Sequence, residues 1–123
     1  MTSPADNQSL VAELSDRQLA AYNAADLEAF CACYHQHVRV LDEDGNATCE
    51  GMEAFRARYA ALFGSCSEVR AAIRQRIALG RSVVELEVYQ RRPHASGLLE
   101  EGEVIVRYTE RDGLIAIAQF IKG

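Results

Sequence analysis

The first third of the chain carries hydrophobic positions at helical spacing. Intervals of three and four residues predict an amphipathic helix, with a stripe formed by Leu10, Val11, Leu14 and Tyr22 and the polar Gln18 on the same line. Ser3-Pro4-Ala5-Asp6 is typical of a helix start. Serine can cap the helix, proline suits its first turn, and the acid three residues later can reach back to the backbone amide of the serine. Asp26 can cap a second, short apolar helix from Leu27 to about Tyr34.

A strand and a third helix follow. Val38-Arg39-Val40-Leu41-Asp42 has strand character, and Asp44-Gly45-Asn46 supplies the turn that ends it. Gly51 opens the third helix, and Gly64 stands where a left-handed cap would end it. The apolar stripe of this helix is formed by Met52, Phe55, Tyr59, Leu62 and Phe63.

The second half of the chain changes to a period of two, which predicts strands. Alternation runs through residues 69–79 and, after a turn at Gly80, through residues 84–89. A loop leads to a strand around residues 104–108, and Arg111-Asp112-Gly113 is a hairpin signal before a last strand at 114–121. Three helices followed by meandering strands predict one α+β domain, residues 1–123, with the helices on one face of a mainly antiparallel sheet.

The last strand, Leu114 to Ile121, is apolar at both parities. A strand of this kind is covered on both faces. The predicted helices cover only one face, so a second subunit is the simplest cover for the other. The pattern therefore predicts a homodimer through the sheet face. The alternative is a strand that is covered on both faces inside the fold of one chain.

Composition limits the possible partners. The net charge of -5 and a pI of about 5.2 leave no basic surface for nucleic acid or an anionic membrane. No apolar run approaches the roughly 20 residues of a membrane span, and the first residues lack the features of a secretory signal. We therefore expect a cytoplasmic protein whose cysteines, Cys31, Cys33, Cys49 and Cys66, are reduced thiols.

Three segments carry a resemblance to a known family. Residues 18–30, Gln-Leu-Ala-Ala-Tyr-Asn-Ala-Ala-Asp-Leu-Glu-Ala-Phe, resemble the helix-break-helix segment of SnoaL-like and ketosteroid-isomerase-like proteins. Residues 38–42 with 51–56, and then 111–115, are similar to the strand, third helix and closing hairpin of that nuclear transport factor two-like superfamily. The resemblance implies a cystatin-like cone, in which a strongly curved sheet and helices enclose an apolar cavity, and commonly a dimer through the outer sheet face.

The resemblance also suggests a catalytic residue. It places the general base of ketosteroid isomerase at Asp42, but its oxyanion tyrosine at Gln18 and its second acid near Val106. Losing one such donor typically costs about 10²–10³ in rate, so steroid isomerisation by that mechanism is not expected. A SnoaL-type cyclase would need an acid near the C-terminus, which residues 120–123 do not provide. The alternative for Asp42 is a solvated residue of the acidic turn that follows the strand.

Five other residues are candidates for ligand binding. A polar group on an apolar helix stripe needs a partner, and for Gln18 that partner is either a ligand carbonyl or a neighbouring core group. The same choice applies to Gln119 on the last strand. Tyr22, Tyr34 and Tyr59 present hydroxyls to the cavity or are core residues with their hydroxyls at the surface.

No metal site or cofactor is predicted. Cys31 with His35, and Cys33 with His37, have the spacing of pairs on one helix face, but no second matching pair accompanies them. We interpret the cysteines as small buried apolar groups. Glu85 and Glu87, with Arg74 and Arg76, are interpreted as the polar face of two strands, joined at most by cross-strand pairs.

Three functions follow from these observations. The first is binding of a small apolar or carbonyl-containing ligand in the cone. The second is a cofactor-free isomerase, cyclase or hydrolase with Asp42 as general base, and the third is a non-catalytic dimeric protein-interaction module. An open cavity above about 300 Å³ favours ligand binding, whereas a cone filled by Phe30, Phe55, Tyr59 and Phe63 favours the third.

Overall fold

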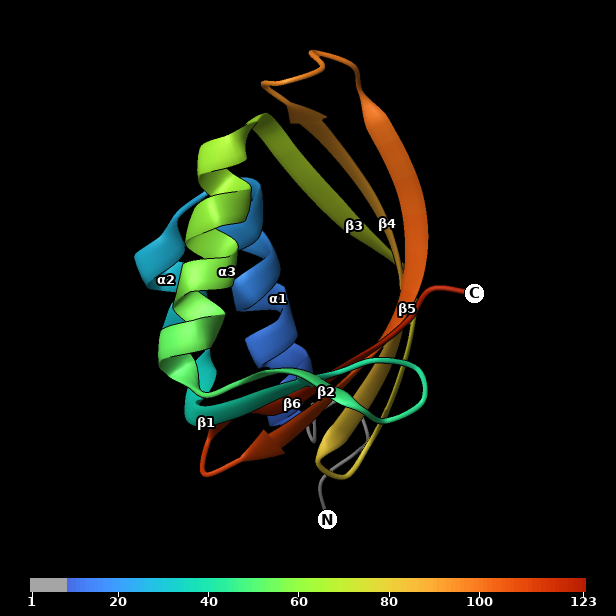
Figure 1. The fold of residues 1–123 in the computed structure, drawn as a ribbon. Coiled ribbons are helices and arrows are strands. Elements are labelled where there is room, and N and C mark those ends of the chain that lie inside the picture. Colours follow the sequence, from blue (N-terminus) through green and yellow to red (C-terminus); the bar gives the residue numbers. More distant parts are fainter. Residues whose placement is uncertain (1–8) are drawn as a thin grey trace.

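The computed structural model describes residues 9–123, in which helices occupy the hollow of one bent sheet (Figure 1). The helices are α1 (Leu10–Asn23), α2 (Leu27–Cys31) and α3 (Met52–Ser65). The strands are β1 (Tyr34–Leu41), β2 (Ala47–Glu50), β3 (Cys66–Leu79), β4 (Ser82–Pro93), β5 (Glu100–Arg111) and β6 (Leu114–Ile121). The predicted α+β class, with helices gathered on one side of a curved sheet, is confirmed.

The sheet has the order β2-β1-β6-β5-β4-β3. Four neighbouring pairs are antiparallel, and β1 with β6 is the one parallel pair in residues 9–123. The sheet is therefore mixed and mainly antiparallel, as predicted. The parallel pair arises because the chain passes through α3 and three further strands before β6 returns to lie beside β1.

The helix boundaries differ from the prediction in two places. Asp26 caps α2 as predicted, since its Oδ1 accepts a hydrogen bond from the Ala29 amide at 3.1 Å. However, α2 ends at Cys31, and Tyr34 already belongs to β1, where it pairs with Ile115 of β6. Pairing within the sheet thus takes over residues whose apolar pattern also suits a helix.

One of the two glycines predicted to bound α3 lies elsewhere in the helix than expected. Gly51 precedes the helix with a φ of +86°, a conformation that favours glycine. Gly64 was expected to cap the helix end, and this is wrong: the helix runs through Gly64 to Ser65, and Cys66 is already extended. The predicted start of the first helix at Ser3–Asp6 lies outside the described residues, and the described part of α1 is capped by Ser9, which accepts from the Ala12 amide.

Aromatic rings fill the space between the helices and the sheet. Phe30 of α2 is fully buried at the centre of this aromatic cluster, and its ring centroid lies 4.6 Å from that of Tyr59 and 5.0 Å from that of Tyr34. Phe55 stacks on Phe30 at 5.8 Å. This cluster fixes α2 and α3 over the sheet and forms the floor on which the site described below is built.

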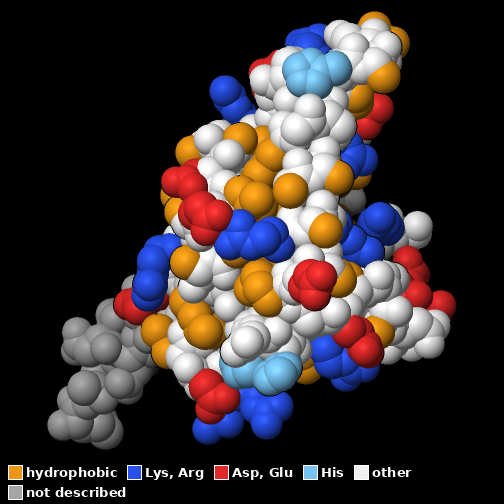
Figure 2. Space-filling model, turned by 60° about the vertical axis from the view of Figure 1, so that its left-hand side comes forward, with side chains coloured by type: hydrophobic (Ala, Val, Ile, Leu, Met, Phe, Trp, Pro, Cys, Tyr) orange, Lys and Arg blue, Asp and Glu red, His pale blue; other side chains and the backbone are white. Residues whose placement is uncertain are grey.

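The two sides of the molecule differ in their surface. On the side shown in Figure 2, apolar side chains are interspersed with charged ones. On the outer face of the sheet, which is turned away from the helices, apolar side chains pair across neighbouring strands. Ile77 of β3 pairs with Val84 of β4, and Ile105 of β5 pairs with Ile121 of β6. The exposed fraction of Ile77 is 74%. None of the helices described here is long and apolar enough to cross a membrane.

Candidate functional site

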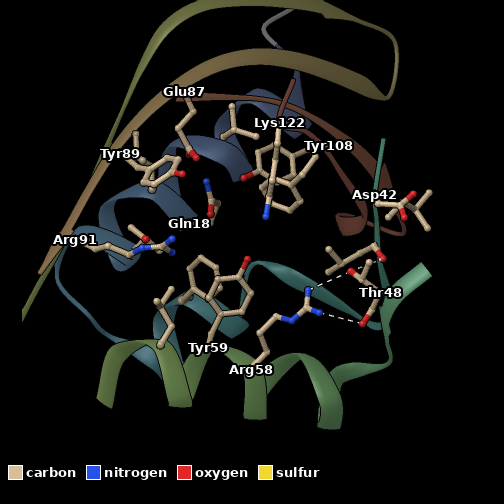
Figure 3. Close-up of a pocket in the computed structure, with 18 of the residues that line it drawn as sticks. Gln18, Asp42, Thr48, Arg58, Tyr59, Glu87, Tyr89, Arg91, Tyr108 and Lys122 are labelled. Atoms are coloured by element: carbon tan, nitrogen blue, oxygen red, sulfur yellow. Dashed lines mark hydrogen bonds between the residues drawn. The ribbon is translucent and has the colours of Figure 1, made fainter. Parts of the chain in front are cut away.

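An open cavity of about 500 Å³ lies between the helices and the inner face of the sheet (Figure 3). Residues of α1, α2 and α3 line one side, and residues of β1, β2, β4, β5 and β6 line the other. The turn after β1 and the chain end after β6 complete its rim. The volume exceeds the 300 Å³ that separates an open pocket from a filled cone, and it falls in the range of ligand sites.

The inner face of β4 contributes the most polar part of this cavity. Glu85 and Glu87 point inward from successive positions of the same parity, opposite Val106 and Val104 of β5. The predicted cross-strand pairing is confirmed for Arg76 with Glu85, but the two acids are more than polar strand positions, because Glu85 also binds Ser15 of α1 and Glu87 lines the cavity. Val84, which directly precedes Glu85, points to the outer face of the sheet, and 38% of its surface is exposed. The face of β4 that carries Val84 is thus turned away from the helices.

Glu85 is buried, and each of its carboxylate oxygens accepts a hydrogen bond. Its Oε1 accepts a hydrogen bond from the Ser15 hydroxyl at 2.7 Å, and its Oε2 accepts one from Arg76 Nε at 2.7 Å. Arg76 also donates to Asp16 Oδ1 at 2.7 Å. Ser15, Asp16, Arg76 and Glu85, here called the Glu85 network, therefore tie α1 to β3 and β4, as a buried charge requires.

Glu87 is half-buried and lines the cavity. Within residues 9–123, no group donates a hydrogen bond to its carboxylate. Burial, followed by the nearby charge of Glu85, raises the pKa of Glu87 from 4.5 to about 7. A carboxyl with this environment can both accept and release a proton near neutral pH.

The charge of Glu87 acts on tyrosine side chains from four elements. Burial raises the pKa of Tyr22 on α1 to about 12, and the charge of Glu87 adds to that effect. Burial and the Glu87 charge also raise the pKa of Tyr34 on β1, Tyr59 on α3 and Tyr108 on β5. These hydroxyls therefore stay protonated at neutral pH and act as hydrogen-bond donors.

Gln18 places an amide in the same cavity. Its side chain is almost fully buried, and its Oε1 accepts a hydrogen bond from the Tyr34 hydroxyl at 3.0 Å. The amide nitrogen donates to no protein group of residues 9–123, so it is available to a molecule in the cavity. Figure 3 shows that Gln18 and Glu87 both point into this cavity. Tyr34 thus fixes the orientation of Gln18 from behind.

The remaining predicted site residues divide between the cavity and its surroundings. Tyr22 and Tyr59 line the cavity, as Gln18 does, whereas Tyr34 is not among the lining residues. Gln119 does not line it either: it pairs with Arg107 on the outward parity of β5, and its amide donates to the Asp42 carbonyl at 3.2 Å.

Asp42 lies at the rim, where β1 ends. Its Oδ1 accepts hydrogen bonds from the Asp44 amide at 3.0 Å and the Asn46 amide at 2.9 Å. These bonds close the turn between β1 and β2, which is the alternative role that the sequence suggested. The second carboxylate oxygen accepts no hydrogen bond from residues 9–123.

One wall of the cavity is built from stacked side chains. The Arg91 guanidinium lies 5.3 Å from the centroid of the Tyr89 ring and forms an ion pair with Glu100 at 3.1 Å. Tyr89 lies across Gly102 on β5, where an added Cβ would come within 2.5 Å of the tyrosine hydroxyl. Gly102 therefore provides the space that keeps Tyr89 flat against the sheet.

The predicted cysteine–histidine pairs do not form on a helix face. His35 and His37 lie in β1, so the spacing that places Cys31 and Cys33 one helical turn away does not apply. No cluster of three or more metal-binding side chains is present in the described part of the chain. The four cysteines are free and buried, and burial raises the pKa of Cys31 and Cys33.

Comparison with solved structures shows the same fold elsewhere. An uncharacterised cystatin-fold protein from Novosphingobium aromaticivorans superimposes with a TM-score of 0.82 at 26% identity, over 94% of this chain and 99% of the other. Rv0760c from Mycobacterium tuberculosis, in complex with estradiol-17β-hemisuccinate, gives 0.81 at 17% identity, over 92% and 93%. The Δ5-3-ketosteroid isomerase from a Mycobacterium species gives 0.79 at 18% identity, over 91% and 92%.

Sequence comparison identifies the family. No curated protein matches the chain. A family model described as the SnoaL-like domain matches residues 16–118, which is most of the chain. The resemblance noted in residues 18–30, 38–42, 51–56 and 111–115 is confirmed, and the chain belongs to the SnoaL-like domain family.

Proposed function

We propose that this protein binds a small, mainly apolar molecule that carries a carbonyl group. The observation that carries the proposal is the open cavity of about 500 Å³, lined by aromatic rings and by the Gln18 amide. The aromatic rings offer apolar contact area, and the amide offers a directed donor to a carbonyl oxygen. A related fold holds a steroid ester, estradiol-17β-hemisuccinate, which supports a ligand of this kind.

The two alternative functions have weaker support. A structural module with a filled cone is disfavoured, because Phe30 and Tyr59 border the cavity without closing it. An isomerase, cyclase or hydrolase with Asp42 as base is disfavoured, because one oxygen of that carboxylate holds two turn amides. The other oxygen of Asp42, which has no hydrogen-bond donor within residues 9–123, allows a direct test of this enzyme hypothesis.

Binding of two matched probes tests the proposal. We expect 2-tetralone, a bicyclic ketone, to shift the NMR signals of Gln18 and Tyr59, and tetralin, which lacks the carbonyl, to bind more weakly. Gln18→Leu should lower the affinity for 2-tetralone about tenfold, the effect of one hydrogen bond of about 1.4 kcal/mol, and leave that for tetralin unchanged. Absence of shifts with both probes contradicts the proposal.

We further propose that two copies associate through the outer face of the sheet. Exposed Ile77, Ile105 and Ile121 on that face support the proposal, because exposed apolar side chains that gather on one sheet face are typical of an interface between chains. Sedimentation equilibrium should give twice the chain mass of 13.6 kDa. Ile105→Asp should return the mass to that of one chain, whereas Glu53→Gln on the helical side should not.

A cytoplasmic location is proposed on the state of the cysteines. All four are free and buried in the folded chain, in keeping with a reducing compartment. Cell fractionation tests this location, and recovery of the protein from a secreted or membrane fraction contradicts it.

A further inference from the structure

We propose that Glu87 is the acid–base group of a proton-transfer site in this cavity, acting on enolisable ketones whose carbonyl oxygen is bound by the Gln18 amide. This inference rests on the proposed ligand-binding function and adds a reaction to it. It assigns the chemistry to a residue of β4, in place of Asp42 at the rim.

The first support is the contrast between Glu87 and its neighbour on the strand. Glu85 receives hydrogen bonds from Ser15 and Arg76 and has no access to the cavity. Glu87 borders the cavity and receives no hydrogen bond from residues 9–123. A half-buried carboxylate without protein partners keeps both oxygens available to a bound molecule.

The second support is the donor set that shares the cavity with Glu87. Tyr34 holds Gln18 Oε1 at 3.0 Å, so the amide N–H groups face the ligand. Tyr59 and Tyr108 also line the cavity and remain protonated. Fixed neutral donors in an apolar site stabilise a negative oxygen more strongly than water does, because they need no reorientation.

The charges near Glu87 place its proton exchange close to neutral pH. Burial and the Glu85 charge act against ionisation of Glu87 and raise its pKa to about 7. The tyrosines on which its charge acts, Tyr22 on α1, Tyr34 on β1, Tyr59 on α3 and Tyr108 on β5, stay neutral in this range. The cavity lining also carries the cationic side chains of Arg58, Arg91 and Lys122 and, at the rim, the acids Asp42 and Glu43. Glu87 therefore changes charge in the cavity between about pH 6 and 8.

The reaction is a balanced proton transfer. The Glu87 carboxylate takes a proton from the carbon next to the carbonyl, the C–H electron pair forms a carbon–carbon double bond, and the carbonyl π pair moves to oxygen. The Gln18 N–H groups donate hydrogen bonds to the resulting enolate oxygen. The protonated Glu87 then returns the proton to the same carbon, or to the far end of a conjugated system, so no electrons are gained or lost.

Deuterium exchange measures this step directly. In D₂O, we expect the wild-type protein to accelerate exchange of the C1 protons of 2-tetralone above the buffer rate, followed by proton NMR. Glu87→Gln should lower the protein-catalysed rate at least 100-fold and leave 2-tetralone bound. Glu103→Gln is the matched control, because Glu103 lies exposed on the outward parity of β5.

Two further measurements separate catalysis from folding and positioning. The wild-type rate should rise with pH through about 7 and then level, following the ¹³C titration of the Glu87 carboxyl. Tyr34→Phe should lower the exchange rate severalfold at saturating 2-tetralone and leave tetralin affinity unchanged, since Tyr34 acts through Gln18 as a positioning residue.

The outcomes distinguish the two proposals. Binding of 2-tetralone without accelerated exchange overturns the proton-transfer site and leaves the binding function standing. Exchange that survives Glu87→Gln but is lost in Asp42→Asn assigns the base to Asp42 and overturns the role of Glu87. Failure of the wild-type protein to bind 2-tetralone overturns the binding function and, with it, this inference.

Discussion

Glu85 and Glu87 are the same side chain on the same face of β4, yet they belong to different parts of the molecule. Glu85 lies beneath α1 with an exposed fraction of 1% and is held by the Ser15 hydroxyl and the Arg76 guanidinium. Glu87 lies one pleat further along, where α1 and α3 leave the cavity open. The comparison shows that partners, and not burial alone, decide whether a buried acid supports the fold or is available for chemistry.

The largest effect should come from breaking the Glu85 network. Glu85→Ala leaves Arg76 without its buried partner and Ser15 without its acceptor. Removing one member of a buried ion pair costs about 3–5 kcal/mol, and urea unfolding should show a loss of that size. Glu103→Ala, on the exposed outer face, should change stability by at most about 0.5 kcal/mol; an equal, small change in both variants would mean that the network does not stabilise the fold.

Glu87 should respond in the opposite direction. Its pKa is raised in the folded protein, so its contribution to stability is fully present below about pH 4.5 and is lost as pH rises through about 7. Glu87→Gln carries no charge at any pH. It should unfold with the same free energy as the wild type at pH 4 and be more stable by on the order of 2–3 kcal/mol at pH 8.

The sign of this difference is decisive. A Glu87→Gln variant that is less stable than the wild type at pH 8 would show that the carboxylate has a partner after all. Its charge would then support the folded state, as that of Glu85 does.

The smallest effect concerns the hydrogen bond between Tyr34 and Gln18. Tyr34→Phe removes the donor at 3.0 Å from Gln18 Oε1 and should cost about 1 kcal/mol. The cavity lets the freed amide turn toward solvent, so the loss should be smaller than that of Glu85→Ala. Chemical denaturation measures it, and a loss as large as that of Glu85→Ala would mean that the amide cannot turn.

The order of the elements could be predicted from the sequence because the two halves have different hydrophobic periods. The Asp26 cap and the Arg111-Asp112-Gly113 hairpin are local signals, and both occur where the pattern placed them. The end of α2 and the continuation of α3 through Gly64 could not be predicted in this way. Sheet pairing at Tyr34 and the direct passage into β3 at Cys66 override the local preference.

The candidate site could be predicted only in part. Gln18, Tyr22 and Tyr59 were found because a helix stripe points toward the sheet. Glu87 was missed because it was interpreted as part of a polar strand face, and the alternation of a strand does not by itself show which of its two faces is turned toward the helices. In this chain both faces of the sheet are partly apolar, so hydrophobicity alone cannot identify the side that faces the helices. The charge pair of Glu85 with Arg76 was the available signal for that side.

The position of β6 has a consequence for how the chain folds. This strand fills the place between β1 and β5, so the two parts of the sheet join only when residues 114–121 arrive. Contacts between segments so distant along the chain slow folding, because the intervening loop must be closed first. During synthesis the helices and the β3–β5 meander can collapse early, whereas the cavity acquires its final walls only after the closing strand has left the ribosome.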